Sequence, residues 1–208
     1  MNKKLVIVGA GGHARVVLDT ALLLNHRIHG ILDLQFNESG EYILGIPVIG
    51  GTELLKQLNP DEFMIAIAIG DNHSRANWHD KVQSHGFELC TLIHPTANLS
   101  EQEMKIEPGV FINAGAVINA CVSIGTGTII NTGAIIDHEC EIGKFVHVAP
   151  GCSIAGRVKI GDSSFIGIGA AIIDKITIGS RAIIGANSTI SKAVNEGEKV
   201  VGINKRVG

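Results

Sequence analysis

From residue 106 to residue 142 the chain reads, in blocks of six, IEPGVF INAGAV INACVS IGTGTI INTGAI IDHECE I, so isoleucine opens every block. The same period continues to Ile190, and 14 of the 15 positions in register are isoleucine, with Val148 as the exception. Small or β-branched residues such as Val110 and Ala116 often stand two positions earlier, and glycine often follows the isoleucine. A strict period of six with this composition is the signature of a parallel β-helix.

The period has a geometric reason. Three short strands joined by three tight corners make one coil of about 18 residues, and each isoleucine points inward onto the isoleucine of the next coil. Burial of each one is worth roughly 1.5–3 kcal/mol, so the stack offsets much of the ordering entropy of the coils. A β-sandwich is excluded because its strands vary in length and its turn signals recur at longer intervals. The period does not set the handedness of the helix.

The first 95 residues lack this period and alternate between strand and helix patterns. Strands are expected at 4–8, 28–32, 63–69 and 88–93, and helices at 13–24, 52–58 and 72–85. This alternation predicts a parallel α/β sheet of Rossmann type. The sequence therefore predicts two domains, 1–95 and 96–208, that meet after Ile93-His94-Pro95, where a proline stops sheet pairing.

Composition and charge exclude several classes of protein. The chain of 208 residues has 17 Lys plus Arg against 20 Asp plus Glu, which leaves no basic footprint for nucleic acid or an anionic membrane. Glycines at 9, 11 and 12 interrupt the first apolar run, and no stretch approaches the length of about 18 apolar residues that a membrane span needs. Four cysteines without CxxC spacing are typical of reduced, mostly buried thiols. We expect a soluble cytoplasmic protein without membrane insertion.

Residues 9–14 read GAGGHA and match the pattern G-x-G-x-x-A between a strand and a helix. Backbone N–H groups at such a helix start can hold a phosphate, and Asp33 at the end of the second strand can meet a ribose or a base. The alternatives are NAD or FAD binding and a glycine turn that serves packing only. A dinucleotide needs two mononucleotide halves, and only about one fits before residue 95, which favours a ligand with one nucleoside, such as a nucleotide-sugar.

An acid-flanked imidazole stands at one predicted corner of the β-helix, where the chain reads Ile136-Asp137-His138-Glu139-Cys140. Such a histidine can act as a general base, because an adjacent carboxylate holds its tautomer and stabilises the imidazolium. A merely solvated corner histidine is the alternative. His147 follows half a coil later and lies on another face. The two histidines can serve one site only across a subunit interface, which points to an oligomer.

Several stretches together resemble the bacterial sugar O- and N-acyltransferase family. They are residues 8–13 (VGAGGH), 92–95 (LIHP), 131–132 (NT), 138–140 (HEC), 142–143 (IG), His147, Gly156 and 158–161 (VKIG). The resemblance covers nearly the whole chain and is nearest to the N-acetyltransferases of UDP-linked 4-amino-sugars. The family also includes GDP-perosamine N-acetyltransferases and sialic acid O-acetyltransferases.

The resemblance implies a left-handed β-helix homotrimer that uses acetyl-coenzyme A and no metal ion, with active sites between subunits. It implies that His138 deprotonates the sugar amine, that Glu139 raises the basicity of His138, and that His147 contacts acetyl-coenzyme A near its carbonyl. Two further positions match the coenzyme channel, Ile168 and Ala186. The positions that match the nucleotide-sugar site are Gly11, Gly12, His13, Asp33, Leu34 and Gly70.

The expected function is therefore acetyl-coenzyme A dependent N-acetylation of the 4-amino group of a nucleotide-linked sugar, of the UDP-4-amino-4,6-dideoxy type, for surface glycan or glycoprotein synthesis. One alternative keeps the coenzyme and acetylates a hydroxyl, as in sialic acid modification. Another is a nucleotide-binding scaffold without catalysis, in which the β-helix only trimerises the α/β domain. The sequence leaves open which base the nucleotide carries and which stereochemistry the sugar has.

Overall fold

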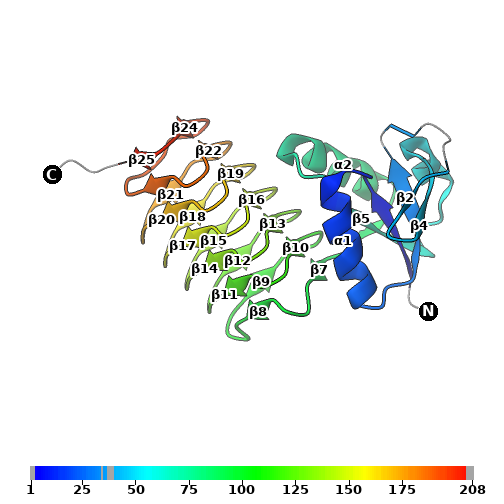
Figure 1. Cartoon of the computed structure of the whole chain (residues 1–208), viewed down its shortest axis with the longest axis horizontal. Coiled ribbons are helices and arrows are strands. Elements are labelled where there is room, and N and C mark those ends of the chain that lie inside the picture. The colour runs from blue at the N-terminus through cyan, green and yellow to red at the C-terminus, as the bar shows by residue number, and fades with distance from the viewer. Residues whose placement is uncertain (1–2, 34, 37–39, 205–208) are drawn as a thin grey trace. The chain divides into compact units, whose positions relative to one another are not determined.

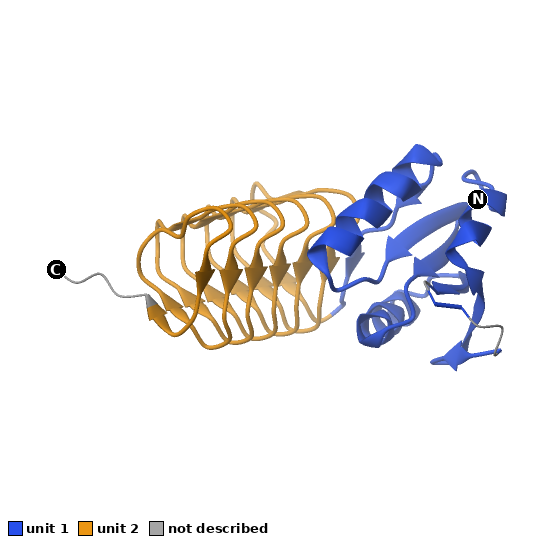
Figure 2. Ribbon diagram, turned by 90° about the horizontal axis from the view of Figure 1, so that it is seen from above, with its two compact units in different colours: residues 1–95 blue, residues 96–208 orange. Residues whose placement is uncertain are grey.

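The computed structural model of the chain describes residues 3–33, 35–36 and 40–204 (Figure 1). The chain divides into two compact units, Met1–Pro95 and Thr96–Gly208, which Figure 2 shows in blue and orange. The first unit combines helices with a sheet. The second is a stack of short strands.

The first unit contains a six-stranded sheet in the order β3-β4-β2-β1-β5-β6. Its strands are β1 (Lys4–Val8), β2 (Ile28–Asp33), β3 (Tyr42–Ile43), β4 (Ile46–Gly51), β5 (Phe63–Ile67) and β6 (Glu88–Leu89). All neighbours pair in parallel except β3 with β4. The sheet confirms the predicted Rossmann-like α/β class, with β1 at its centre between β2 and β5.

Two α-helices accompany this sheet, α1 (Gly12–Leu23) and α2 (Asn72–Ser84). In α1 the fully buried apolar residues recur at spacings of three and four, which is the pattern of a helix with one face in the core. They are Ala14, Val17, Leu18 and Ala21. The start of α2 is capped by Asp71, whose carboxylate accepts a hydrogen bond of 2.8 Å from the backbone N–H of Ser74.

Two local predictions were wrong in this unit, and one hairpin was not predicted. The predicted helix at 52–58 is a 3₁₀ helix, Thr52–Gln57. The hairpin of β3 and β4 was not predicted, because its two-residue turn places Leu44 at φ 49°, a conformation that leucine rarely adopts. The single strand predicted at 88–93 is two strands of different sheets, β6 and β7 (Leu92–Ile93).

The second unit is a parallel β-helix with three sheets. In this unit the first sheet holds β10 (Phe111–Ile112), β13 (Ile129–Ile130), β16 (His147–Val148), β19 (Phe165–Ile166), β22 (Ile183–Ile184) and β24 (Lys199–Val200). The second holds β8 (Asn98–Leu99), β11 (Val117–Ile118), β14 (Ile135–Ile136), β17 (Ser153–Ile154), β20 (Ala171–Ile172), β23 (Thr189–Ile190) and β25 (Ile203–Asn204). The third holds β9 (Lys105–Ile106), β12 (Ser123–Ile124), β15 (Glu141–Ile142), β18 (Lys159–Ile160) and β21 (Thr177–Ile178).

The register of these sheets confirms the predicted coil length, which is three blocks of the repeat. Ile136 pairs with Ile154, and Ile154 pairs with Ile172, so each inward isoleucine stacks on its counterpart one coil later. The last coil is shorter, since Ile184 pairs with Val200. The isoleucine repeat runs from Ile106 to Ile190, but strands of the β-helix lie both before and after it in the sequence, such as β8 before and β24 after.

The interior of the β-helix is a stack of buried, mostly aliphatic side chains. Every isoleucine of the repeat from Ile112 to Ile190, together with Val148, is at most 3% exposed. The positions two residues earlier are also buried and hold small or β-branched side chains. Where they carry a hydroxyl, it is satisfied, as at Thr128, which donates to the Gly143 carbonyl at 2.8 Å and accepts from Val146 N–H at 3.1 Å.

The corners share one backbone conformation. Three positions after each inward residue from Ile106 to Ile184, φ lies between 52° and 73°, in the left-handed region that makes a tight turn. Six of these corner residues are glycine, but others carry side chains, among them Cys121, Glu139 and Arg157. The fold therefore places these three side chains in one column, each one coil after the last.

Candidate active site

His138 lies at the corner between β14 and β15, and about half of its side-chain surface is exposed. The corner is fixed by Asp137, because one of its carboxylate oxygens accepts hydrogen bonds of 2.8 Å from the His138 backbone N–H and from the Asn119 side-chain amide. The coil before therefore braces the backbone that carries His138.

The imidazole of His138 is oriented by the next residue. His138 Nδ1 lies 2.9 Å from Glu139 Oε2. A carboxylate only accepts, so Nδ1 carries the proton and donates it to this hydrogen bond, and Nε2 keeps a free lone pair. The arrangement is that of a general base, with the proton-accepting nitrogen pointing away from the carboxylate.

The other side of the imidazole lies against the following coil. A Cβ built on Gly156 would stand 2.6 Å from His138 Nε2 and 2.7 Å from Cε1. The ring therefore occupies space that any residue with a side chain at position 156 would fill. Glycine is therefore required at position 156 for the imidazole of His138 to lie where it does.

The Glu139 carboxylate has a second donor. Arg157 Nε donates to the same oxygen, Oε2, at 2.9 Å. Hydrogen bonds from His138 and then from Arg157 hold the pKa of Glu139 below its ordinary value. Glu139 is therefore an ionised carboxylate at neutral pH, which is the form that stabilises an imidazolium.

His147 lies on a different face from His138, in β16 of the first sheet. The backbone N–H of Thr132 donates to Asn131 Oδ1 at 2.9 Å, which fixes the orientation of that amide. Asn131 Nδ2 then donates to His147 Nε2 at 3.2 Å. His147 is therefore the neutral tautomer with its proton on Nδ1.

Ile168 and Ala186 lie together at one corner, in adjacent coils after β19 and β22. The backbone N–H of Asn187, next to Ala186, donates to the Ile168 carbonyl at 2.7 Å. Both side chains are exposed. This corner joins the first sheet to the second, whereas the His138 corner joins the second to the third. One chain thus does not bring His138 together with Ile168 and Ala186.

The predicted nucleotide-site residues gather at the carboxyl edge of the α/β sheet. Gly11, Gly12 and His13 follow β1, Asp33 ends β2, and Gly70 follows β5. The strand order reverses at β1, and such a switch point is where open α/β sheets bind ligands. A Cβ built on any of the three glycines meets no atom within 4 Å, so the space above them is open. Leu34 lies outside the described residues.

Two arginines near this edge were missed by the sequence analysis. Arg75 is 2% exposed and donates to the carbonyls of Ile69 and Gly70 at 3.1 and 2.9 Å. Burial lowers the pKa of Arg75 to about 10. Arg15 is exposed and donates to the Gly11 carbonyl at 3.1 Å. For Arg15 the sequence contained a signal, because Arg15 follows Gly11 by one helical turn and can therefore reach its carbonyl.

Three contacts at corners of the β-helix were also not predicted. The coil length indicates each of them, because the two partners lie one coil apart in the sequence. Asn119 and Asp137 are one coil apart, and Gly156 and Arg157 follow His138 and Glu139 by the same interval. Applying the coil period to the polar corner residues, as well as to the isoleucines, would have found all three.

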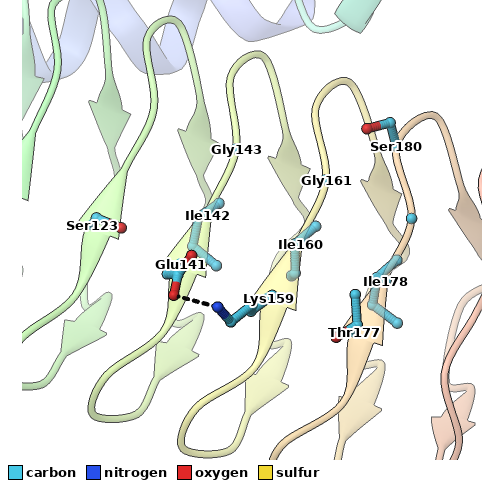
Figure 3. Close-up of a pocket in the computed structure, with 11 residues that line it drawn as sticks. Ser123, Glu141, Ile142, Gly143, Lys159, Ile160, Gly161, Thr177, Ile178 and Ser180 are labelled. Atoms are coloured by element: carbon cyan, nitrogen blue, oxygen red, sulfur yellow. Dashed lines mark ion pairs between the residues drawn. The ribbon is translucent and has the colours of Figure 1, made fainter.

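A shallow groove of about 490 Å³ lies on the third sheet, where Ser123, Glu141, Lys159 and Thr177 line it from successive coils (Figure 3). Glu141 and Lys159 form an ion pair of 2.7 Å across two coils. None of the predicted site residues lines this groove. Its two charged side chains, Glu141 and Lys159, are paired with each other.

Family models match both units of the chain. A model described as the PglD N-terminal domain matches residues 4–82, and one described as bacterial transferase hexapeptide (six repeats) matches residues 157–192. A comparison with curated protein sequences finds no significant match.

Solved structures match nearly the whole chain. A mutant of perosamine N-acetyltransferase from Caulobacter crescentus, in complex with CoA and GDP-perosamine, is 34% identical over 97% of this chain and 95% of that one, with a TM-score of 0.91. The acetyltransferase domain of PglB from Neisseria gonorrhoeae, in complex with acetyl coenzyme A, is 38% identical over 97% of each chain, with a TM-score of 0.91. WeeI from Acinetobacter baumannii shares the fold at 23% identity and a TM-score of 0.88.

These matches confirm the predicted fold class, including a left-handed β-helix. Within the described ranges no group of three or more His, Cys, Asp or Glu residues is arranged to hold a metal ion. The same part of the chain contains no helix with the length and hydropathy that crossing a membrane requires.

Proposed function

The chain belongs to the family of hexapeptide-repeat sugar acetyltransferases, and we propose that it transfers the acetyl group of acetyl-coenzyme A to the 4-amino group of a nucleotide-linked sugar. The observation that carries the proposal is the His138–Glu139 pair, which presents a free Nε2 lone pair at an exposed corner. Relatives that are 34–38% identical hold CoA with an amino-sugar nucleotide or acetyl-coenzyme A.

In the proposed reaction the neutral sugar amine attacks the thioester carbonyl, and a carbon–nitrogen bond forms. His138 Nε2 takes a proton from the nitrogen as positive charge develops there, and ionised Glu139 stabilises the imidazolium. The tetrahedral intermediate then collapses with cleavage of the carbon–sulfur bond. The coenzyme leaves as a thiolate that takes up the proton, so His138 returns to its neutral form.

His147, Ile168 and Ala186 are proposed to line the coenzyme site. His147 is proposed to contact acetyl-coenzyme A near its thioester carbonyl. Because these residues lie on other faces than His138, the complete site combines two neighbouring chains in a homotrimer. Two large side chains that point outward from the same sheet as His147, Phe165 and Ile183, are 37% and 40% exposed, which supports a covered face.

Residues 1–95 are proposed as the nucleotide-sugar-binding domain and 96–208 as the acyltransferase domain. Gly11 and Gly12 would admit the diphosphate to the start of α1, where backbone N–H groups point at it. Asp33 would accept hydrogen bonds from the ribose or the base. The open space above Gly11, Gly12 and Gly70 supports this assignment.

The product is proposed to serve surface glycan or glycoprotein synthesis, and the reaction to take place in the cytoplasm. Four free cysteines, Cys90, Cys121, Cys140 and Cys152, support a reducing compartment.

The test is a matched panel of acceptors with acetyl-coenzyme A. It contains UDP- and GDP-linked 4-amino-sugars, the same nucleotides with a 4-hydroxyl, and free sialic acid. Thiol release is followed by colour, and the acetylated product by mass spectrometry. We expect turnover with the 4-amino-sugars alone. Turnover with sialic acid or a 4-hydroxyl would identify an O-acetyltransferase, and no turnover with any acceptor would favour a scaffold.

A further inference from the structure

Arg157 contacts the His138–Glu139 pair from the following coil, and no step of the proposed reaction involves Arg157. Its Nε–H and the Nδ1–H of His138 converge on one atom, Glu139 Oε2, each at 2.9 Å. We infer that Arg157 is a positioning residue, which holds the Glu139 carboxylate against His138 and sets how strongly that carboxylate stabilises the imidazolium. The inference rests on the proposed function of His138 as general base.

Exposure leaves the Glu139 carboxylate weakly held by His138 alone. The side chain of Glu139 is nearly half exposed, and its backbone is at φ 57° on a tight corner. A glutamate held by one hydrogen bond at such a place loses that contact readily, because it gives up rotamer entropy to keep it. The second donor from Arg157 restricts the carboxylate to the rotamer that faces His138. The backbone N–H of Arg157 also donates to the His138 carbonyl at 2.9 Å, which ties the two corners together.

The positive charge of Arg157 acts in the opposite direction to its positioning of Glu139. A guanidinium on the same oxygen draws charge from the carboxylate, and its own positive charge opposes protonation of the imidazole. The consequence is a weaker stabilisation of the imidazolium once it forms.

The other charged groups of this corner are engaged elsewhere. On the same coil, the Asp137 carboxylate accepts from Asn119 and from the His138 backbone. One coil back the column holds Cys121, whose Sγ lies 3.9 Å from Glu103 Oε2. Two coils on, Lys175 pairs with Asp174 at 3.3 Å. Among the charged residues named here, Arg157 is therefore the cation that contacts the His138–Glu139 pair.

Two substitutions separate the two effects. Arg157→Gln removes the charge, and Arg157→Lys keeps a charge but loses the planar N–H that fits the carboxylate. In Arg157→Gln we expect kcat to fall about tenfold on the pH plateau, with both KM values unchanged, because positioning is lost. We also expect the acid limb of kcat/KM against pH to move up by about half a pH unit, because removal of the cation favours the imidazolium. In Arg157→Lys we expect kcat to fall and the acid limb to move to lower pH, because the positive charge remains while the carboxylate is held less well against His138.

The chain offers matched controls. Lys159→Gln breaks an ion pair with Glu141 between the same two coils, on the third sheet (Figure 3). Lys175→Gln removes a positive charge from the same corner column one coil further on. Both should leave the kcat and the acid limb of the wild type unchanged. Thermal unfolding of all variants controls for loss of structure.

The titration of His138 provides a readout that does not need turnover. Its midpoint is followed by NMR on histidine-labelled protein and assigned by the signal that His138→Asn removes. It should rise in Arg157→Gln, where the positive charge is removed, and fall in Arg157→Lys, where the charge remains but the carboxylate is held less well. A midpoint in Arg157→Gln that overlays the wild type would overturn the inference even if no acceptor is acetylated. A selective rise in the KM of one substrate would also overturn it, because Arg157 would then bind that substrate.

Discussion

Gly156 occupies the coil that follows His138, and a Cβ at Gly156 would stand 2.6 Å from His138 Nε2. The His138 imidazole is therefore placed by two neighbours of different kinds, a carboxylate that holds Nδ1 and a glycine that leaves room for Nε2. The second relationship is steric, and it has a direct consequence for activity.

Gly156→Ala should lower kcat about 10²-fold with a small change in KM, because the added methyl pushes the ring away from its position and a shift of about 1 Å in a reacting group has an effect of this order. The backbone of Gly156 has no positive φ, so alanine is tolerated at the corner itself. Steady-state kinetics and thermal unfolding check the prediction. Wild-type kcat in a folded Gly156→Ala protein would contradict the proposed place of the ring.

His138→Ala should abolish turnover while the protein stays folded. Loss of a general base costs about 10²–10⁴ in rate, and the side chain lies on the outer corner, outside the isoleucine stack. Steady-state kinetics on the preferred acceptor measure the loss. A variant with kcat within a factor of about three of the wild type would remove His138 from the catalytic role.

The sequence predicted the β-helix well and its corner contacts poorly, for one physical reason. The inward positions must hold the same aliphatic shape in every coil, so Ile136, Ile154 and Ile172 repeat and the period is visible. The corner positions need only a tolerated left-handed backbone, so their side chains vary freely, as Glu139 and Arg157 do. The contact between these two follows from the stacking of successive coils and has no repeated residue type to mark it.

In the α/β unit the failures have local causes. The turn at Leu44 escaped prediction because leucine at a positive φ contradicts turn propensities. The segment 88–93 has a continuous strand pattern, yet Cys90 and Thr91 separate β6 from β7. A pattern records which residues prefer extended backbone, and it does not record which sheet each strand joins.

The isoleucine stack gives a prediction for stability. Ile154→Lys should unfold the protein or lower its stability by several kcal/mol, because Ile154 is 1% exposed and the interior around it offers no partner for a charge. Ser153→Lys is the matched control, since Ser153 is the adjacent residue of β17 and its side chain is exposed. Its stability should stay within about 0.5 kcal/mol of the wild type. Urea unfolding followed by circular dichroism compares them, and equal midpoints would contradict an inward Ile154.

The proposed trimer gives a prediction for assembly. Ile183→Asp should yield monomers with little activity, because a carboxylate on the outward face of the first sheet would be buried against a neighbouring chain. Thr177→Asp places the same charge on the polar third sheet and should remain trimeric. Light scattering at assay concentration measures the mass. A wild-type protein that is monomeric and fully active would exclude a site shared between chains.

The last prediction concerns the glycine loop. Gly11 has φ −73°, and a Cβ there meets no protein atom within 4 Å, so Gly11→Val should fold normally. If the backbone of this loop approaches a diphosphate, the valine side chain occupies the place of a phosphate oxygen and nucleotide-sugar affinity falls. Acetyl-coenzyme A, bound at the β-helix, should still stabilise the variant.

Thermal shifts with a UDP-sugar, a GDP-sugar, NAD and acetyl-coenzyme A on wild type and Gly11→Val measure this, because a ligand that binds only the folded state raises the melting temperature. We expect one of the two sugar nucleotides to protect the wild type and to lose that effect in the variant. Protection by NAD, with none by either sugar nucleotide, would instead assign a dinucleotide to residues 1–95. Equal protection of both proteins by the sugar nucleotide would place its phosphates away from Gly11.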